Sequence, residues 1–314
     1  MLDPLLGADG ADAVVELWHR FGEYGQYSEE GHPTRFAPEI PQRWDAVANY
    51  VRTHPEDGRL AAARTNYFRE TYAYGDDIRI AGVEPFLRHP GLVDAARRIH
   101  GREVIEPAIV YANILLPGQE LAVHTDVPEF RGANRTIVPQ WLLVVMLHSG
   151  LFEAWRMPVA TAVCYFGDAT GGEIAYFVDG EPRRYAPKHD TAIVLDTDTV
   201  FHGVERVGGD EAALHLLRRN MRLRHEGDRR WTLRSKEGEA VAGFGTDDLR
   251  YSVSWKAYCF ADDAERDAWA THSDDLTLEA ILDRLADDVG ERPADDEAFG
   301  RLLIERYVRF PQPA

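Results

Sequence analysis

The chain has 314 residues, of which 45% are hydrophobic and 28% charged, and this ordinary composition excludes a disordered or fibrous protein. Its net charge of −18 repels phosphate backbones and anionic lipid, so we expect a small-molecule substrate and neither a nucleic-acid nor a membrane partner. The longest apolar run covers residues 141–147, far fewer than the ~20 residues that a membrane-spanning helix needs.

The N-terminal third, residues 1–103, is predicted to be a helical flank. Its first ten residues lack a basic segment followed by an apolar stretch, so we expect no signal peptide and a cytoplasmic protein. Further along, apolar residues recur at helical spacing, and Gly101 is a typical stop for the last of these segments. Polar, proline-containing connections such as 31–41 separate them. Helices are predicted around 14–21, 44–51 and 92–99.

From about Val104 the hydrophobic period changes from 3.6 to 2, and turn signals such as Pro117–Gly118 and Gly171–Gly172 separate short segments. Many strands without intervening helices favour an antiparallel sandwich or barrel over a doubly wound sheet. The predicted strands are 107–116, 119–127, 136–148, 159–167, 172–178, 191–197, 199–207, 213–224 and 249–260.

Helices are predicted again after Phe260, with one apolar stripe from Leu278 to Val289 that ends at Gly290 and a last helix around 302–307. Residues 261–300 hold fourteen acidic residues against three arginines, which is typical of a solvated helical face. The sequence therefore predicts a mainly β core at 104–260 with N- and C-terminal α-helices, the latter being the acidic flank 261–314, in one catalytic domain.

The segment that follows Leu121 contains His124 and Asp126, two residues apart. On a strand these side chains project from the same face. An imidazole beside a carboxylate supplies two ligands of a 2-His-1-carboxylate triad, which suits Fe(II) because it leaves other coordination positions open. The third ligand must come from a distant strand, and His202, in a His-Gly-Val sequence after an apolar strand, is the candidate.

The predicted strand 249–260 has one apolar face and one polar face that carries Arg250, Ser252, Ser254 and Lys256. An arginine inside a barrel is costly unless an anion compensates its charge. A guanidinium matches a carboxylate with two hydrogen bonds, and a serine hydroxyl adds another donor. The strand therefore indicates a carboxylate site, and the alternative is a polar face exposed to solvent.

Together, His124-Thr-Asp126, His202 and Arg250-Tyr-Ser252 resemble the motifs of the Fe(II)/2-oxoglutarate-dependent dioxygenase superfamily. The resemblance covers roughly residues 104–260 and implies a double-stranded β-helix, also called a jelly roll, which is cupin-like. It implies that the two histidines and the aspartate hold Fe(II) as the catalytic metal. It also implies that 2-oxoglutarate binds this metal together with O2, with its distal carboxylate at Arg250 and Ser252.

The resemblance extends to two further stretches. Tyr111 and Asn113 precede the metal motif where family members often place co-substrate contacts, and 171–177 resembles the family's mid-core strand. The implied reaction is hydroxylation, or another oxidation at a C–H bond, of a small molecule such as an amino acid or a natural-product intermediate. Halogenating relatives lack the carboxylate ligand, so Asp126 argues against halogenation. The stretch 127–140 is interpreted as a surface loop or as a cover over the site.

The sequence departs from the family at one point, because Arg250 lies 48 residues beyond His202 instead of one strand later. We interpret 208–247 as an insertion; otherwise Arg218, Arg219 or Arg222 would take the role of Arg250.

Two other classes of function stay open. A metal-dependent hydrolase would use the same ligands to bind Zn²⁺ and activate water. In a non-catalytic β-sandwich binding protein the triad would be a coincidence.

Overall fold

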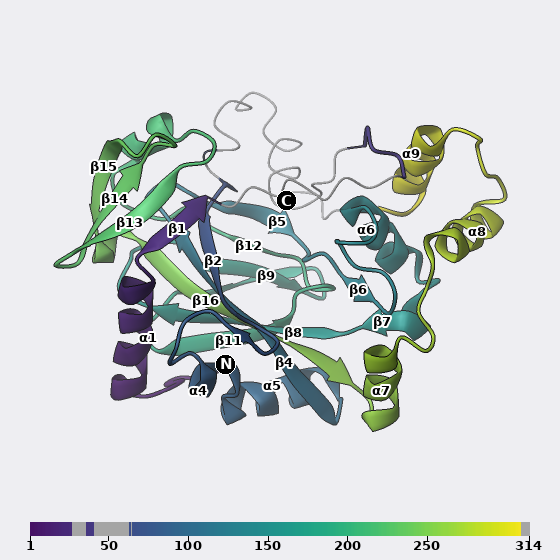
Figure 1. Ribbon diagram of the computed structural model, residues 1–314, viewed down its shortest axis with the longest axis horizontal. Coiled ribbons are helices and arrows are strands. Elements are labelled where there is room, and N and C mark those ends of the chain that lie inside the picture. The colour runs from purple at the N-terminus through teal and green to yellow at the C-terminus, as the bar shows by residue number, and fades with distance from the viewer. Residues whose placement is uncertain (27–35, 41–62, 64, 309–314) are drawn as a thin grey trace.

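The structure is a computed structural model that describes residues 1–26, 36–40, 63 and 65–308. Its centre consists of two antiparallel sheets (Figure 1). The large sheet contains, in spatial order, β11 (Thr191–Asp196), β8 (Val159–Phe166), β16 (Arg250–Phe260), β4 (Val104–Leu115), β2 (Phe68–Tyr74), β1 (Glu23–Gln26), β13 (Arg222–Gly227), β14 (Arg230–Arg234) and β15 (Ala240–Gly245), with β3 (Asp77–Ile78) beside β2. The small sheet contains β10 (Glu181–Tyr185), β9 (Ile174–Val178), β12 (His202–Val204) and β5 (Leu121–His124).

The core strands divide between the two sheets as in a double-stranded β-helix. In chain order, β4, β8, β11 and β16 lie in the large sheet, whereas β5, β9, β10 and β12 lie in the small sheet. The first and last of them, β4 and β16, pair over their whole length, from Val104 opposite Phe260 to Leu115 opposite Arg250. Side chains from both sheets line a common cavity, so the sheets face each other. The predicted mainly β core with helical flanks is confirmed.

Helices cover the face of the large sheet that is turned away from this cavity. They are α1 (Ala8–Phe21), drawn at the left in Figure 1, and α4 (Glu84–Leu87) and α5 (Pro90–His100), drawn below the sheet. Trp18 of α1 stacks on Trp231 and Tyr251, with ring centroids 4.9 and 4.2 Å away. The helix α5 ends at Gly101, which has a φ of 60° and caps it in the left-handed conformation. The helices predicted around 14–21 and 92–99 are therefore confirmed.

The N-terminal flank is not helical throughout, because β1, β2 and β3 all lie within residues 1–103 and extend the large sheet. The strand β2 carries polar residues on its half-buried face, so its sequence has neither a helical stripe nor a strongly apolar alternation. The helix predicted at 44–51 and most of the connection 31–41 lie outside the described residues.

The prediction of a strand at 136–148 is wrong, since this segment forms the helix α6 (Gln140–Ser149). Its residues 140–146 are all buried, so the helix has no polar face and no amphipathic period. A short apolar run of this kind cannot be assigned to helix or strand by its periodicity. The strand predicted at 213–224 is also largely wrong, because a 3-10 helix at Glu211–Leu216 precedes β13.

Residues 208–247 contribute no strand to the core of the β-helix. Instead β13, β14 and β15 form a meander that joins the large sheet through the pairing of β13 with β1. The strands β10, β14 and β15 were not predicted from the sequence. They are short and largely exposed or polar, so their apolar period is weak.

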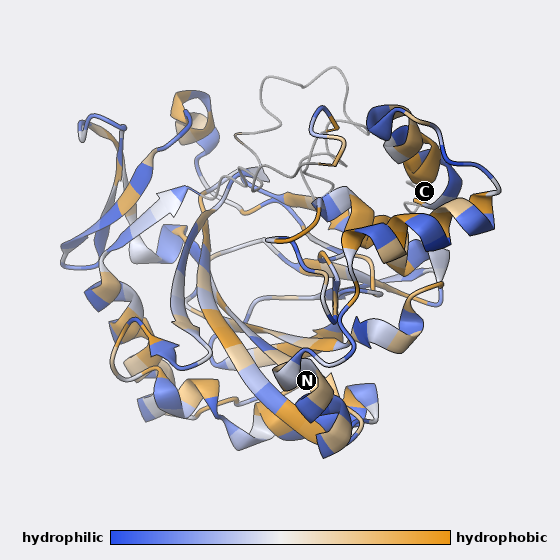
Figure 2. Ribbon diagram, turned by 45° about the vertical axis from the view of Figure 1, so that its right-hand side comes forward, coloured by the Kyte–Doolittle hydropathy of each residue, from blue (hydrophilic) through white to orange (hydrophobic). Residues whose placement is uncertain are grey.

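The C-terminal flank consists of α7 (Asp263–Thr271), α8 (Leu278–Val289) and α9 (Asp296–Tyr307). Figure 2 shows hydrophobic and hydrophilic residues alternating around these helices. The apolar side chains of α8 and α9 pack with α6 in a second hydrophobic cluster, which includes Trp141, Ile281, Leu285, Phe299 and Leu303. No helix in the described ranges is both long and apolar enough to cross a bilayer.

A loop after the metal motif is tied to this flank. It begins with β6 (Glu129–Phe130), which pairs with β7 (Arg156–Met157). The buried Arg131 guanidinium donates hydrogen bonds to the Asp274 carboxylate from Nε and Nη2, both at 2.9 Å, and Nη2 also donates to the carbonyl of Ala154. The backbone N–H of Leu276 donates to the carbonyl of Arg131 at 3.0 Å. The C-terminal flank therefore holds the 129–135 loop in place.

Gly132 tests this junction, because it has a φ of +80° and an added Cβ would overlap the backbone of Leu276. Gly180 has the same φ but nothing within 4 Å of an added Cβ. We expect Gly132→Ala to lower the free energy of unfolding by about 2 kcal/mol more than Gly180→Ala, since both variants carry the same backbone strain and only one carries the overlap. Urea denaturation of both variants measures this difference, and equal losses would contradict the close packing.

Candidate metal centre

Pairing between β5 and β12 brings the two predicted histidine ligands together. His124 and His202 are direct cross-strand partners in the small sheet, and their ring centroids lie 4.6 Å apart. Asp126 follows β5 two residues later. One ligand atom from each of the three residues lies within 4.8 Å of the others. The structure thus assembles the His124, Asp126 and His202 set from segments far apart in the sequence.

The two carboxylate oxygens of Asp126 have different partners. Oδ1 lies 3.9 Å from Nε2 of each histidine. Oδ2 accepts hydrogen bonds from Lys256 Nζ and Thr197 Oγ1, both at 2.6 Å. The backbone is also fixed, since the N–H of Asp126 donates to the carbonyl of Thr197 at 2.8 Å. Because Oδ2 is already engaged, Oδ1 is the atom that Asp126 offers to a metal.

Both imidazoles have the tautomer that metal binding requires. Nδ1 of His124 donates to the carbonyl of Ala122 at 2.7 Å, and Nδ1 of His202 donates to that of Val200 at 2.9 Å. A carbonyl only accepts, so each Nε2 keeps its lone pair. Burial, reinforced by His124, lowers the pKa of His202 to about 4 against the opposing effect of Asp126. The ring of His202 is therefore neutral at pH 7.

The carboxylate of Asp126 is ionised. Burial opposes its charge, but the Lys256 ammonium and the two histidines outweigh burial and hold the pKa of Asp126 well below its usual range. Burial also opposes the charge of Lys256, and Asp126 outweighs it and raises the pKa of Lys256 above its ordinary value. The site thus combines two histidines with one carboxylate whose charge Lys256 balances.

A cavity between the sheets, which we call the Arg250 cavity, joins these ligands to Arg250. Arg250 is 2% exposed, and it donates from Nε to the carbonyl of Gly172 at 2.7 Å and from Nη1 to Ser252 Oγ at 3.2 Å. Its Nη2 is buried and has no hydrogen-bond partner among the described residues. The cavity is lined by Tyr67, Tyr111, Asn113, Leu115, Leu121, His124, Asp126, Thr161, Val163, Ile174, Thr197, His202, Val204, Arg250, Ser252 and Ser254.

The register of β4 against β16 places the other predicted site residues on the same cavity. Asn113 lies opposite Ser252, and Tyr111 lies opposite Ser254. Asn113 Nδ2 donates to Ser254 Oγ at 2.9 Å, while its buried Oδ1 has no partner in the described part of the chain. The structure therefore brings Tyr111, Asn113, Arg250 and Ser252 together with the three candidate metal ligands.

The alternative arginines lie elsewhere. Arg218 donates to the carbonyls of His215 and Leu217, and Arg222 pairs with Glu23 on β1. Arg218, Arg219 and Arg222 do not line the Arg250 cavity. The glycine turn at 171–172 fits Arg250 instead, since a Cβ on Gly172 would overlap the Arg250 side chain.

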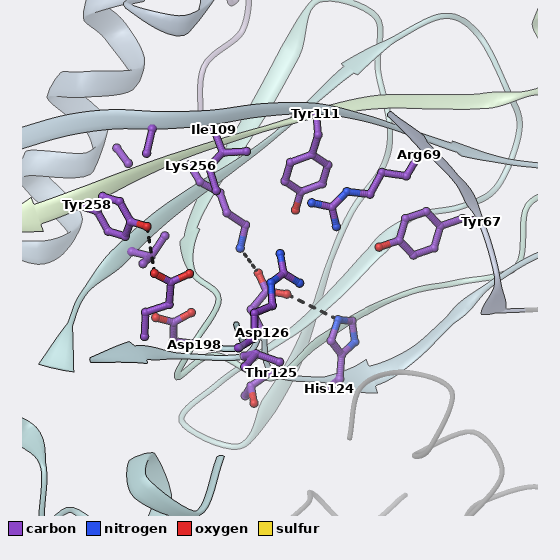
Figure 3. A pocket seen from close by; sticks show the side chains of 16 residues that line it. Tyr67, Arg69, Ile109, Tyr111, His124, Thr125, Asp126, Asp198, Lys256 and Tyr258 are labelled. Carbon is purple, nitrogen blue, oxygen red and sulfur yellow. Dashed lines mark hydrogen bonds and ion pairs between the residues drawn. The ribbon is translucent and has the colours of Figure 1, made fainter. Parts of the chain in front are cut away.

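A second cavity, which we call the Glu129 cavity, adjoins the first and shares Tyr67, Tyr111, His124 and Asp126 with it. Figure 3 shows Tyr258 and Asp198 on one side of Asp126, and Tyr67 and Arg69 on the other. The cavity is lined by Tyr67, Arg69, Ala108, Ile109, Tyr111, His124, Thr125, Asp126, Val127, Glu129, Arg135, Val159, Asp198, Lys256, Ala257 and Tyr258. The 127–140 stretch therefore contributes to the site through Val127, Glu129 and Arg135.

Sequence reasoning did not assign roles to Lys256, Thr197, Asp198 or Tyr258. The alternation that pointed to Arg250 and Ser252 also places Lys256 on the cavity face of β16, so Lys256 could have been predicted as a site residue from the sequence. Thr197 and Asp198 lie in the turn between β11 and β12, where no residue period indicates which side chains point inward.

Comparisons with known proteins find distant similarity to solved structures only. No family model and no curated protein matches the sequence. Among solved structures, the chain is similar to a 2OG-Fe(II) oxygenase family oxidoreductase from Burkholderia pseudomallei, at 11% identity and a TM-score of 0.35, over 69% of this chain and 92% of that one. It is also similar to a prolyl-4-hydroxylase from Pseudomonas putida, at 14% identity and a TM-score of 0.35, over 80% and 98% of the two chains.

A third similar structure is HygX from Streptomyces hygroscopicus with nickel, 2-oxoglutarate and hygromycin B bound. It is 7% identical with a TM-score of 0.41, over 82% of this chain and 80% of that one. Likeness at this level carries no functional assignment. The function of this chain follows from the residues of its own site.

Lys256→Met removes the cation that faces Asp126. In the metal-free protein this leaves a half-buried carboxylate uncompensated, and we expect the free energy of unfolding to fall by about 2 kcal/mol. A bound metal cation compensates the same carboxylate, so Ni²⁺ should raise the melting temperature of this variant by more than it raises that of the wild type. Thermal denaturation with and without Ni²⁺ measures both effects. Lys256→Arg keeps the charge and is the control, and equal Ni²⁺-induced shifts in the methionine variant and the wild type would contradict the assignment.

Proposed function

We propose that the protein is an Fe(II)- and 2-oxoglutarate-dependent oxygenase that hydroxylates, or otherwise oxidises at a C–H bond, a small-molecule substrate. One observation carries this proposal. A His-Asp-His donor set lines the same cavity as a buried arginine, one of whose guanidinium nitrogens has no partner among the described residues. The catalytic core at 104–260, with its insertion at 208–247, and the cytoplasmic location stay predictions of the sequence.

The donor set fits Fe(II). His124 and His202 are held with free Nε2 atoms, and Asp126 presents one ionised oxygen. Two imidazole nitrogens and one carboxylate oxygen on one side of a metal leave its other positions open, which is the arrangement of non-haem Fe(II) oxygenases. The carbonyl partners of the histidines and the Lys256 and Thr197 partners of Asp126 fix the orientation of the ligands before metal arrives.

The Arg250 cavity fits a dicarboxylate. A buried guanidinium without an anion is costly, and the unpartnered Nη2 of Arg250 marks where a carboxylate would be held. Ser252 Oγ lies beside Nη1 and provides a further donor, while Tyr111 and Asn113 line the path toward the metal ligands. According to the family resemblance, Fe(II) and 2-oxoglutarate together activate dioxygen for the oxidation of a substrate C–H bond.

The alternatives leave part of the site unexplained. A Zn²⁺ hydrolase would need the triad but not the buried Arg250 and Ser252 pair. A non-catalytic sandwich would need neither, although both line one cavity. Oxygen uptake discriminates the three classes. We expect uptake that depends on both 2-oxoglutarate and Fe(II), is not supported by Zn²⁺, and disappears when either component is withheld.

Removing a metal ligand should remove the metal. We expect wild-type protein to bind Fe(II) or Ni²⁺ at near 1:1, and His124→Ala and Asp126→Ala to lose this binding because each removes one of three ligands. Calorimetric titration with Ni²⁺ measures the stoichiometry, and His215→Ala, at an exposed histidine, is the control. Stoichiometric binding in both ligand variants would refute the metal site.

Arg250→Ala should weaken 2-oxoglutarate binding while leaving the metal in place. The lost charge-assisted contact is worth about 1.5–3 kcal/mol, so the dissociation constant should rise by about 10- to 100-fold. Titration of the Ni²⁺-loaded protein with 2-oxoglutarate measures this change, and Arg222→Ala is the control. The assignment fails if the control weakens binding and Arg250→Ala does not.

A further inference from the structure

The Glu129 cavity ends in an acidic group built from three separate parts of the chain. Glu129 lies in β6, Asp198 in the turn before β12, and Tyr258 near the end of β16. The Tyr258 hydroxyl donates to Glu129 Oε2 at 2.9 Å, as the dashed line in Figure 3 shows. This hydrogen bond holds the Glu129 carboxylate in one orientation at the cavity wall.

Asp198 also lines this cavity, and one of its carboxyl oxygens has no hydrogen-bond partner in the described part of the chain. The residue is 1% exposed, and its Oδ2 is buried and without a hydrogen-bond partner among the described residues. Burial raises the pKa of Asp198 well above its ordinary value, although Lys256 acts in the opposite direction. Buried polar atoms are nearly always satisfied in native proteins. The orphaned oxygen therefore indicates a ligand that supplies a donor.

The same lining contains three cations, namely Arg135, Lys256, which donates to Asp126, and Arg69, which lies over the ring of Tyr111. Glu129 and the orphaned oxygen of Asp198 accept hydrogen bonds, and a ligand cation with N–H donors suits them best. The cavity also has apolar walls from Ile109, Val127 and Val159. The net charge of −18 raises the local concentration of cations around the protein and lowers that of anions. These three features match an ammonium group on a short hydrocarbon stem.

We propose that the substrate of this oxygenase is a small aliphatic amine, and that Glu129 and Asp198 bind its protonated nitrogen. This inference rests on the proposed function, since it concerns the substrate of the same site. The acidic group lies on one side of Asp126 in the cavity that also contains His124 (Figure 3). An amine held there directs its carbon chain along the apolar wall toward the metal ligands, so a C–H bond of the chain, and not the nitrogen, is presented for oxidation.

The experiment uses the full-length protein loaded with Co²⁺ and saturated with 2-oxoglutarate at pH 7. The probes are n-pentylamine and 1-pentanol, which differ only in the group that the two carboxyls would recognise. Proton NMR of each probe measures its dissociation constant, and paramagnetic broadening by Co²⁺ reports whether its methylene groups lie near the metal. We expect the amine to bind at least about tenfold more tightly than the alcohol, with broadened methylene signals.

The variants Glu129→Gln and Asp198→Asn keep the shape of the two side chains and replace each carboxyl group by an amide, which cannot ionise. Each should reduce the preference for the amine by about tenfold. Glu181→Gln, at an exposed position on β10, is the matched control and should leave the preference unchanged. If Asp198→Asn fails to fold, Tyr258→Phe provides the second test, because it removes only the hydroxyl that orients Glu129 and should lower the preference by a smaller factor.

The inference is overturned if pentanol binds as tightly as pentylamine, or if the preference survives in the two amide variants. Binding of 2-oxoglutarate to the Co²⁺ protein is measured first, because it distinguishes failure of the proposed function from failure of the substrate class. Loss of that binding contradicts the proposed function itself. Intact 2-oxoglutarate binding without an amine preference contradicts only the substrate class.

Discussion

The pairing of β4 with β16 is the constraint on which the site depends. Because side chains alternate along both strands, one face of the pair meets the helices α1, α4 and α5, and the other faces the cavities. Tyr251, Val253 and Trp255 are buried in the helix-facing core, whereas the alternate positions carry Arg250 and Ser252. A shift of one residue in this register would bury the arginine among the helices and turn the tryptophan toward the cavity. Burial of the apolar side chains against the helices therefore stabilises one register of β4 and β16, and this register places Arg250 and Ser252 on the cavity face.

The period of two was sufficient to predict the long core strands and the cavity face of β16. It failed where the period is absent, as in the fully buried α6, or where polar residues interrupt it, as in β2. The proximity of His124 and His202 depends on which distant strands pair, and residue spacing does not contain that information. His202 was a candidate because a third ligand had to come from a distant strand and a His-Gly-Val sequence follows an apolar strand. Asp198 and Thr197 lie in a turn without a period, so only the three-dimensional structure places them at the site.

The charges at the centre are arranged around Asp126 before any metal is present. Lys256 and Thr197 hold one oxygen, and the other faces the two imidazoles. These hydrogen bonds hold the carboxylate in one orientation, and the lowered pKa of His202 leaves that ring neutral at pH 7. Metal binding then requires little rearrangement of the protein, and the lysine lets the protein keep a buried carboxylate charged while the metal is absent.

The hydrogen bonds between Arg131 and Asp274 have a consequence for how this protein can be altered. They join the acidic C-terminal flank to the loop that carries Glu129, but they do not reach the strands that carry His124 and His202. The loop that carries Glu129 and the strands that carry the two histidines are thus held by different contacts, although Glu129 and the metal ligands His124 and Asp126 line one cavity. Sequence changes around 272–276 would therefore act on the wall of the Glu129 cavity from a surface segment that contains no residue of either cavity.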